Sequence, residues 1–193
     1  IVVGDGHPLG IPVSSGGPYL GFMCCKKHIV RQMPGRIIGR TEDSDGTPGF
    51  TLTLQAREQH IRRGKATSNI CTNQGLLVTA ATIYMSLLGS QGLREVAVSS
   101  HKGLAMLRSE LAAVGITPRF NGPCFHEQVF ELPVAADAMV DALVQESVVP
   151  GLSLAFMGER FAHSLLINVT ETKTEEDIAN LVALMQSVVK VEA

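Results

Sequence analysis

A long apolar and helical pattern in the middle of the chain constrains its fold most strongly. Residues 76–88 form the longest apolar stretch, and because hydroxyl side chains interrupt it, we predict a buried helix and not a membrane span. Gly89 breaks the pattern, and apolar residues then recur at helical spacing over residues 93–114. The parts before and after these helices differ in character, so we predict domains over residues 1–94 and 95–193.

The part after the helices alternates extended and helical patterns. We predict strands over residues 116–120, 125–132, 152–156 and 164–169. One helix is expected to begin at Pro133, and another to follow a near capping box at residues 174–177. This alternation predicts a compact α/β domain.

The part before the helices is rich in glycine and proline. Short strands are predicted over residues 1–3 and 19–25, followed by a short helix over residues 26–32. A hairpin is then expected to pair residues 36–39 with residues 50–54 around an Asp/Gly turn. The abrupt start on a β-branched run suggests a piece of a longer polypeptide, and no basic-then-apolar leader for secretion is seen.

Composition narrows the class of protein. The cysteines Cys24, Cys25, Cys71 and Cys124 form no CxxC pair, so we expect reduced thiols and a cytoplasmic protein. No pair of His, Cys or carboxylate residues has metal-ligand spacing, so no metal site is predicted. The formal net charge of −2 gives no global field that would attract nucleic acid.

The chemistry of the chain is concentrated in residues 55–72, QAREQHIRRGKATSNICT, called here the basic loop. Its cationic and titratable side chains are Arg57, His60, Arg62, Arg63 and Lys65. The hydroxyl and amide residues Thr67, Ser68 and Asn69 follow, and Thr67 or Ser68 is placed to cap the helix over residues 76–88. Cations before a helix N-terminus attract phosphate or carboxylate, so we predict that an anion binds here. The alternative is a solvated loop whose charges keep it soluble.

The residues alone do not assemble a catalytic centre. His7 follows a strand in a glycine-rich turn, a common position for active-site residues in α/β proteins. No GxSxG, Walker or GxGxxG motif is found. A phosphate- or nucleic-acid-binding module that uses the basic loop therefore stays open as an alternative function.

The segments REQHIRRGKATSNICTNQ, GDGHPLGIPVSSGGPYLGFM and MPGRIIG resemble the glycine decarboxylase (P-protein) family of the glycine cleavage system. The resemblance is closest to subunit 1, the N-terminal-half type of the two-subunit bacterial form, and to the later part of that subunit. It implies an α/β fold similar to fold type I enzymes that use pyridoxal 5′-phosphate (PLP). The chain would then comprise the end of a large, mostly parallel sheet domain and a small C-terminal α/β domain.

The resemblance also implies a reaction and partners. The family decarboxylates glycine with PLP as electron sink and passes the aminomethyl group to the lipoyl arm of H-protein. In the two-subunit form the Schiff-base lysine belongs to the other subunit, subunit 2, and the assembly is expected to be a cytoplasmic heterotetramer. The resemblance places His7 at the position equivalent to that lysine, and no lysine occurs between Ile1 and Cys25. We therefore expect PLP to be bound covalently by the partner subunit and not by this chain.

The resemblance sharpens the interpretation of the basic loop. The KATSN turn resembles the loop that lends a hydroxyl to the PLP phosphate of the neighbouring subunit, so Thr67, Ser68 and Asn69 are the candidate cofactor contacts. Arg57, His60 and Arg62 are candidates for a catalytic role. The entrance used by glycine, bicarbonate or H-protein is a second possible role, for these three residues together with Arg63 and Lys65. Ion pairs at a subunit interface explain the same charges equally well. A third alternative is a purely structural partner subunit that lends no residue to the site.

Overall fold

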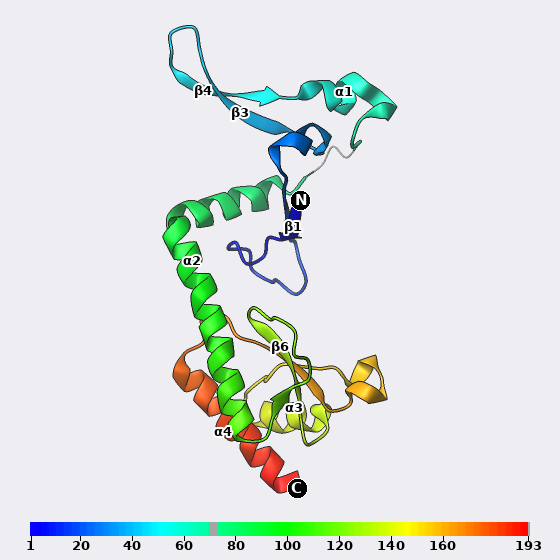
Figure 1. Cartoon of the computed structure of the whole chain (residues 1–193), viewed down its shortest axis with the longest axis vertical. Coiled ribbons are helices and arrows are strands. Elements are labelled where there is room, and N and C mark those ends of the chain that lie inside the picture. The colour runs from blue at the N-terminus through cyan, green and yellow to red at the C-terminus, as the bar shows by residue number, and fades with distance from the viewer. Residues whose placement is uncertain (70–72, 193) are drawn as a thin grey trace. The chain divides into compact units, whose positions relative to one another are not determined.

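The computed structural model describes residues 1–69 and 73–192, in two compact units, Ile1–Leu88 and Gly89–Ala193 (Figure 1). The boundary predicted from the sequence lay after residue 94. The backbone leaves the helical conformation at Gly89 (φ 62°, ψ −174°), inside helix α2 (Gly75–Ala113). A positive φ is readily adopted by glycine, which explains why the helical pattern breaks at this residue.

The first unit is built from two antiparallel hairpin-like pairs and several short helical turns (Figure 1). Strand β1 (Val2–Asp5) pairs with β2 (Gly21–Cys24), and β3 (Ile37–Glu42) pairs with β4 (Pro48–Thr53). The 3₁₀ helix η1 (Lys27–Gln32) lies between the two pairs, as predicted. Asp43 accepts the backbone N–H groups of Asp45 and Thr47 and so closes the turn of the predicted hairpin.

The first part of α2 is exposed, which corrects the prediction of a buried helix over residues 76–88. Leu76 is 83% and Leu87 is 81% exposed. The buried cluster of the first unit is small and consists of Ile11, Leu20 and Ala81. The apolar pattern was therefore a correct sign of a helix, but this unit contains too few packing partners to cover its face.

By length and composition, α2 is the one helix of the described residues that could cross a membrane. The most apolar 18-residue segment of this helix has a mean hydropathy of 1.4, and 6% of that segment is buried. The prediction against a span considered residues 76–88 alone, whereas the helix continues beyond Gly89. A core helix of a soluble protein has the same composition, so length and apolarity do not identify what covers this face.

The second unit is an antiparallel sheet packed with helices around one core. The strand order is β5 (Thr117–Pro118), β6 (Glu127–Glu131), β8 (Ser164–Asn168) and β7 (Leu152–Ser153). The second part of α2, α3 (Ala136–Gln145) and α4 (Glu175–Glu192) each add buried side chains to the same cluster. Its fully buried members include Leu104, Leu107, Leu111, Phe130, Met139, Leu143, Leu165 and Met185.

Predicted and observed elements of this unit agree in type and differ at their ends. Helix α3 begins at Ala136, so Pro133 precedes the helix and does not lie in its first turn. Strand β7 ends at Ser153, and the 3₁₀ helices η4 (Ala155–Met157) and η5 (Glu159–Phe161) follow. All strand pairs of the described residues are antiparallel, so the parallel sheet implied by the resemblance is not formed within them.

A reciprocal capping box precedes helix α4, as the sequence predicted. The Thr174 N–H and hydroxyl both donate to Asp177 Oδ2 at 2.9 Å, and the Asp177 N–H donates to Thr174 Oγ1 at 3.1 Å. The backbone hydrogen bond from Thr174, followed by its hydroxyl, lowers the pKa of Asp177. The carboxylate form is therefore the one that the folded state prefers.

Replacing this cap should destabilise the second unit. We expect Thr174→Ala to lower the free energy of unfolding by about 1 kcal/mol at neutral pH. A lowered pKa stabilises the fold above the usual pKa of an aspartate, and this stabilisation is lost as the pH falls through the folded value. The difference between Thr174→Ala and the parent should therefore shrink in acid. Urea unfolding at several pH values checks this. The control is Thr172→Ala, which removes a hydroxyl bonded to Thr170 before the helix and leaves the cap intact. A pH-independent difference would contradict the prediction.

Candidate functional site

The described part of the basic loop folds into three short helical turns. These are η2 (Gln55–Arg57), α1 (Gln59–Arg62) and η3 (Arg63–Lys65). Positive φ angles at Leu54 (55°) and Arg63 (53°) redirect the backbone before and within them. The loop is therefore a sequence of tight turns, in which the positions of the cations are set by local backbone hydrogen bonds.

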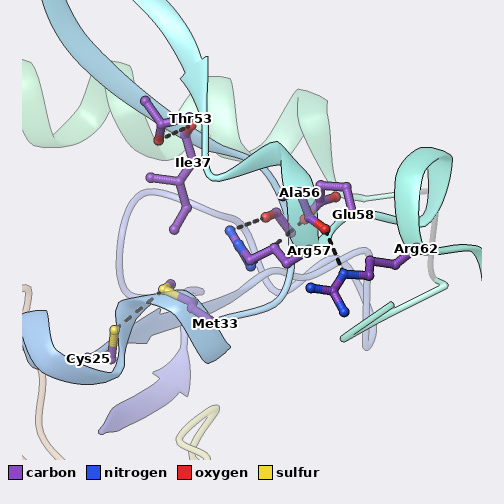
Figure 2. Close-up of polar contacts among 9 residues, drawn as sticks. Cys25, Met33, Ile37, Thr53, Ala56, Arg57, Glu58 and Arg62 are labelled. Carbon is purple, nitrogen blue, oxygen red and sulfur yellow. Dashed lines mark hydrogen bonds and ion pairs between the residues drawn. The ribbon is translucent and has the colours of Figure 1, made fainter. Parts of the chain in front are cut away.

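Two arginines of the loop bind backbone carbonyls. Arg57 Nη2 donates to the Gly35 carbonyl at 2.7 Å, and Arg62 Nε donates to the Ala56 carbonyl at 3.0 Å. Figure 2 shows the Arg62 side chain directed at Ala56 and the Arg57 guanidinium directed away from it. The Arg57 bond joins the basic loop to the start of the β3–β4 hairpin, so the loop is anchored to the rest of the first unit.

Thr67 lies next to Arg57 in the folded loop. The Thr67 N–H donates to the Arg57 carbonyl at 3.4 Å, and Thr67 is exposed. Ser68 and Asn69 each have an interaction partner in the structure. The structure therefore brings the candidate phosphate contact Thr67 together with the candidate catalytic residue Arg57.

The predicted helix cap at Thr67 or Ser68 is wrong. Helix α2 begins at Gly75, and the Val78 N–H donates to the Gln74 carbonyl. Thr67 and Ser68 have the side chains of capping residues, but they lie more than one turn before Gly75, where the helix begins. Cys71 and Thr72 of the basic loop lie outside the described residues.

The other basic side chains of the loop form an exposed rim. His60, Arg62, Arg63 and Lys65 are all exposed, whereas Arg57 and Glu58 are partly buried. Clustered exposed cations attract anions by long-range electrostatics and are screened by salt. The rim can therefore meet an acidic surface or a small anion.

His7 belongs to a separate group that follows β1. Its Nδ1 lies 2.6 Å from Asp5 Oδ1, and the same oxygen accepts the His7 N–H at 2.7 Å. The backbone hydrogen bond and then the imidazole lower the pKa of Asp5. The imidazole also stacks on Tyr19, with ring centroids 5.7 Å apart. Asp5 and Tyr19 thus fix the ring with Nε2 as its remaining polar atom.

Sequence reasoning missed Asp5, Gly35 and Glu58 as partners in these groups. Asp5 could have been found, because an aspartate side chain in a turn commonly accepts the backbone N–H two residues further on, here that of His7. Gly35 and Glu58 carried no such signal. Among the described residues, no three His, Cys, Asp or Glu side chains could hold a metal ion, and Cys24, Cys25 and Cys124 are free thiols.

Comparison with known proteins identifies the family of this chain. The family described as "Glycine cleavage system P-protein" matches residues 1–185. The chain belongs to the P-protein family. A P-protein relative, "Probable glycine dehydrogenase (decarboxylating) subunit 1" of Thioalkalivibrio sulfidiphilus (strain HL-EbGR7), is 56% identical over 187 residues. The match covers 97% of this chain and 42% of that relative, so the chain spans about two fifths of the relative's length.

Solved structures confirm the predicted α/β fold of the P-protein family. The crystal structure of glycine decarboxylase (P-protein) in inhibitor-bound form is 41% identical, with a TM-score of 0.81 over 96% of this chain and 42% of that chain. A structure described as SPT with PLP is 14% identical, with a TM-score of 0.50 over 81% of this chain and 40% of that chain, and shows the fold alone. The fold of this P-protein segment is therefore shared with a PLP-containing protein.

Proposed function

We propose that this chain is part of subunit 1 of glycine dehydrogenase (decarboxylating), and that its basic loop completes a PLP site whose coenzyme is held by the partner subunit. The position of Thr67 carries the proposal. The Thr67 side chain is exposed, and the Thr67 N–H donates to the Arg57 carbonyl. The loop around it carries several basic side chains. A hydroxyl among cations suits a phosphate, which accepts hydrogen bonds and carries negative charge.

The residues present fit a chain that contributes to PLP binding without holding the coenzyme covalently. The turn after β1 contains His7 and no lysine, and His7 Nδ1 is already bound to Asp5. When bound, PLP supplies the electron sink for loss of the glycine carboxylate. Thr67, with Ser68 and Asn69, would hold its phosphate, and the Asp5-oriented His7 would offer Nε2 as a hydrogen-bonding atom.

The exposed rim supports a role in recognition. His60, Arg62, Arg63 and Lys65 would shape the entrance used by glycine, and their charge would attract bicarbonate or an acidic face of the lipoylated H-protein. The relative named subunit 1 implies a second subunit, and we propose that this is the PLP-bearing subunit 2 in a heterotetramer. The free thiols of Cys24, Cys25 and Cys124 support a cytoplasmic location.

Substituting Thr67 tests the phosphate contact. In the assembled enzyme, Thr67→Ala should weaken PLP retention by about tenfold or more, because a hydrogen bond to a charged group is lost. PLP affinity is measured by absorbance titration of the assembled complex. Thr67→Ser keeps the hydroxyl and should retain affinity, and Thr51→Ala on β4 is a control for loss of an exposed hydroxyl. Unaltered affinity in Thr67→Ala would remove the contact from the account.

A further inference from the structure

The Arg57 side chain is almost fully covered, although it belongs to a cationic loop. Its side chain is 10% exposed, while Arg62, Arg63 and Lys65 of the same loop are exposed. Transfer of a guanidinium out of water is strongly unfavourable unless partners replace the lost hydration. A buried arginine therefore needs hydrogen-bond acceptors for its guanidinium N–H groups.

The described residues satisfy only part of the Arg57 guanidinium. Nη2 donates to the Gly35 carbonyl at 2.7 Å. Nε and Nη1 are buried and have no hydrogen-bond partner among the residues that the structure describes. Glu58 Oε1 lies 3.8 Å from Nη1, which is too far for a hydrogen bond but close enough for charge attraction. Buried side-chain donors are usually paired, so two unpaired donors on one guanidinium indicate a missing acceptor.

A purely structural role for Arg57 accounts for Nη2 but not for Nε or Nη1. The bond to Gly35 holds the basic loop against the start of the hairpin, and a lysine or glutamine could donate to that carbonyl too. A planar guanidinium with further N–H groups is suited to a ligand with several acceptor atoms, such as a carboxylate or a phosphate. The Thr67 N–H donates to the Arg57 carbonyl, so Arg57 lies beside Thr67, the proposed phosphate contact.

We propose that Arg57 binds a small oxyanion, carboxylate or phosphate, through the donors that Gly35 leaves unused, and that Glu58 competes with that anion. Glu58 is the nearest carboxylate to the guanidinium and its side chain is 19% exposed, so it can remain paired or turn towards water. Nε and Nη1 are covered in this structure, so the ligand would bind when Glu58 turns towards water and uncovers them. The exposed arginines and lysine of the same loop favour an anion there. The inference rests on the proposed function only for the choice of glycine and phosphate as probes.

The test follows the Arg57 Nε–H resonance of the full-length chain by NMR during titration with inorganic phosphate or with glycine at constant ionic strength. Phosphate, the carboxylate of glycine, or both should shift this resonance. Arg57→Lys should weaken binding by about tenfold or more, and Glu58→Gln should tighten it, because the competing charge is removed. Arg40→Gln, an exposed site on β3, removes the same charge elsewhere and should leave affinity unchanged.

The outcomes separate the source of the anion and the two proposals. A response to phosphate alone assigns a phosphate group, and a response to glycine alone assigns a carboxylate. If Arg57→Lys does not fold, the Nε titration and Glu58→Gln decide the question in folded protein. No shift with either anion, or unchanged affinity in Glu58→Gln, would overturn the inference. Anion binding at Arg57 without activity of the assembled enzyme would contradict the proposed function and leave this inference standing.

Discussion

Replacing Phe130 with alanine should lower the free energy of unfolding of the second unit by about 3–5 kcal/mol. Phe130 is fully buried in β6, which pairs with both β5 and β8, so its ring lies in the core shared by the sheet and its helices. Removing it deletes apolar contacts and leaves a cavity that the paired strands cannot close without breaking their register. The loss is a large fraction of the stability of an ordinary domain.

The measurement for Phe130→Ala is amide hydrogen exchange in β6 and β8 of the full-length chain. Exchange reports the opening free energy of these strands without assuming that both units unfold together. Phe156→Ala is the matched control, because Phe156 is 75% exposed and its removal should change exchange little. Equal exchange in the two variants would show that Phe130 does not anchor this core.

The elements of the second unit could be predicted because local and tertiary signals agree there. Thr174 and Asp177 form the capping box that their spacing indicated, and the apolar face that includes Ile178 and Met185 enters the core. The break at Gly89 was also visible, since glycine alone tolerates that backbone without strain. Ends of elements were less predictable, as α3 shows, because Pro133 fits a first turn but tertiary contacts start the helix at Ala136.

Burial in the first unit could not be predicted in the same way. An apolar helix predicts a buried face but not the segment that covers it, and Leu76 and Leu87 are exposed in this chain. The capping assignment of Thr67 failed for a related reason: a capping residue type does not state how far away its helix begins. Both errors concern tertiary contacts and element ends, which the spacing of residue types along the sequence does not determine.

The candidate site was predicted in composition but not in geometry. The basic loop was visible as a charge cluster. That Arg57 alone turns inward, towards Gly35, depends on the positive-φ turns at Leu54 and Arg63 and on the hairpin beside them. A run of like charges gives no sign of which member is buried.

The central claim is that this chain completes a catalytic site without carrying the coenzyme itself. Glycine–bicarbonate exchange requires the electron sink that PLP supplies, and the turn after β1 offers His7 in place of an amine that could hold it. Activity should therefore be all or none: the full-length chain alone should give no exchange, and mixing it with the PLP-bearing subunit should restore it. A mixture prepared with Thr67→Ala should regain activity when PLP is in excess, because that variant weakens retention and not assembly.

The most direct measurement is glycine–bicarbonate exchange by the full-length chain, by the PLP-bearing subunit and by their mixture, with the covalent position of the coenzyme determined by mass spectrometry after borohydride reduction. We expect exchange in the mixture alone and the coenzyme linked to a lysine of the partner subunit. Exchange by the full-length chain alone, or reduced coenzyme attached to this chain, would contradict the account.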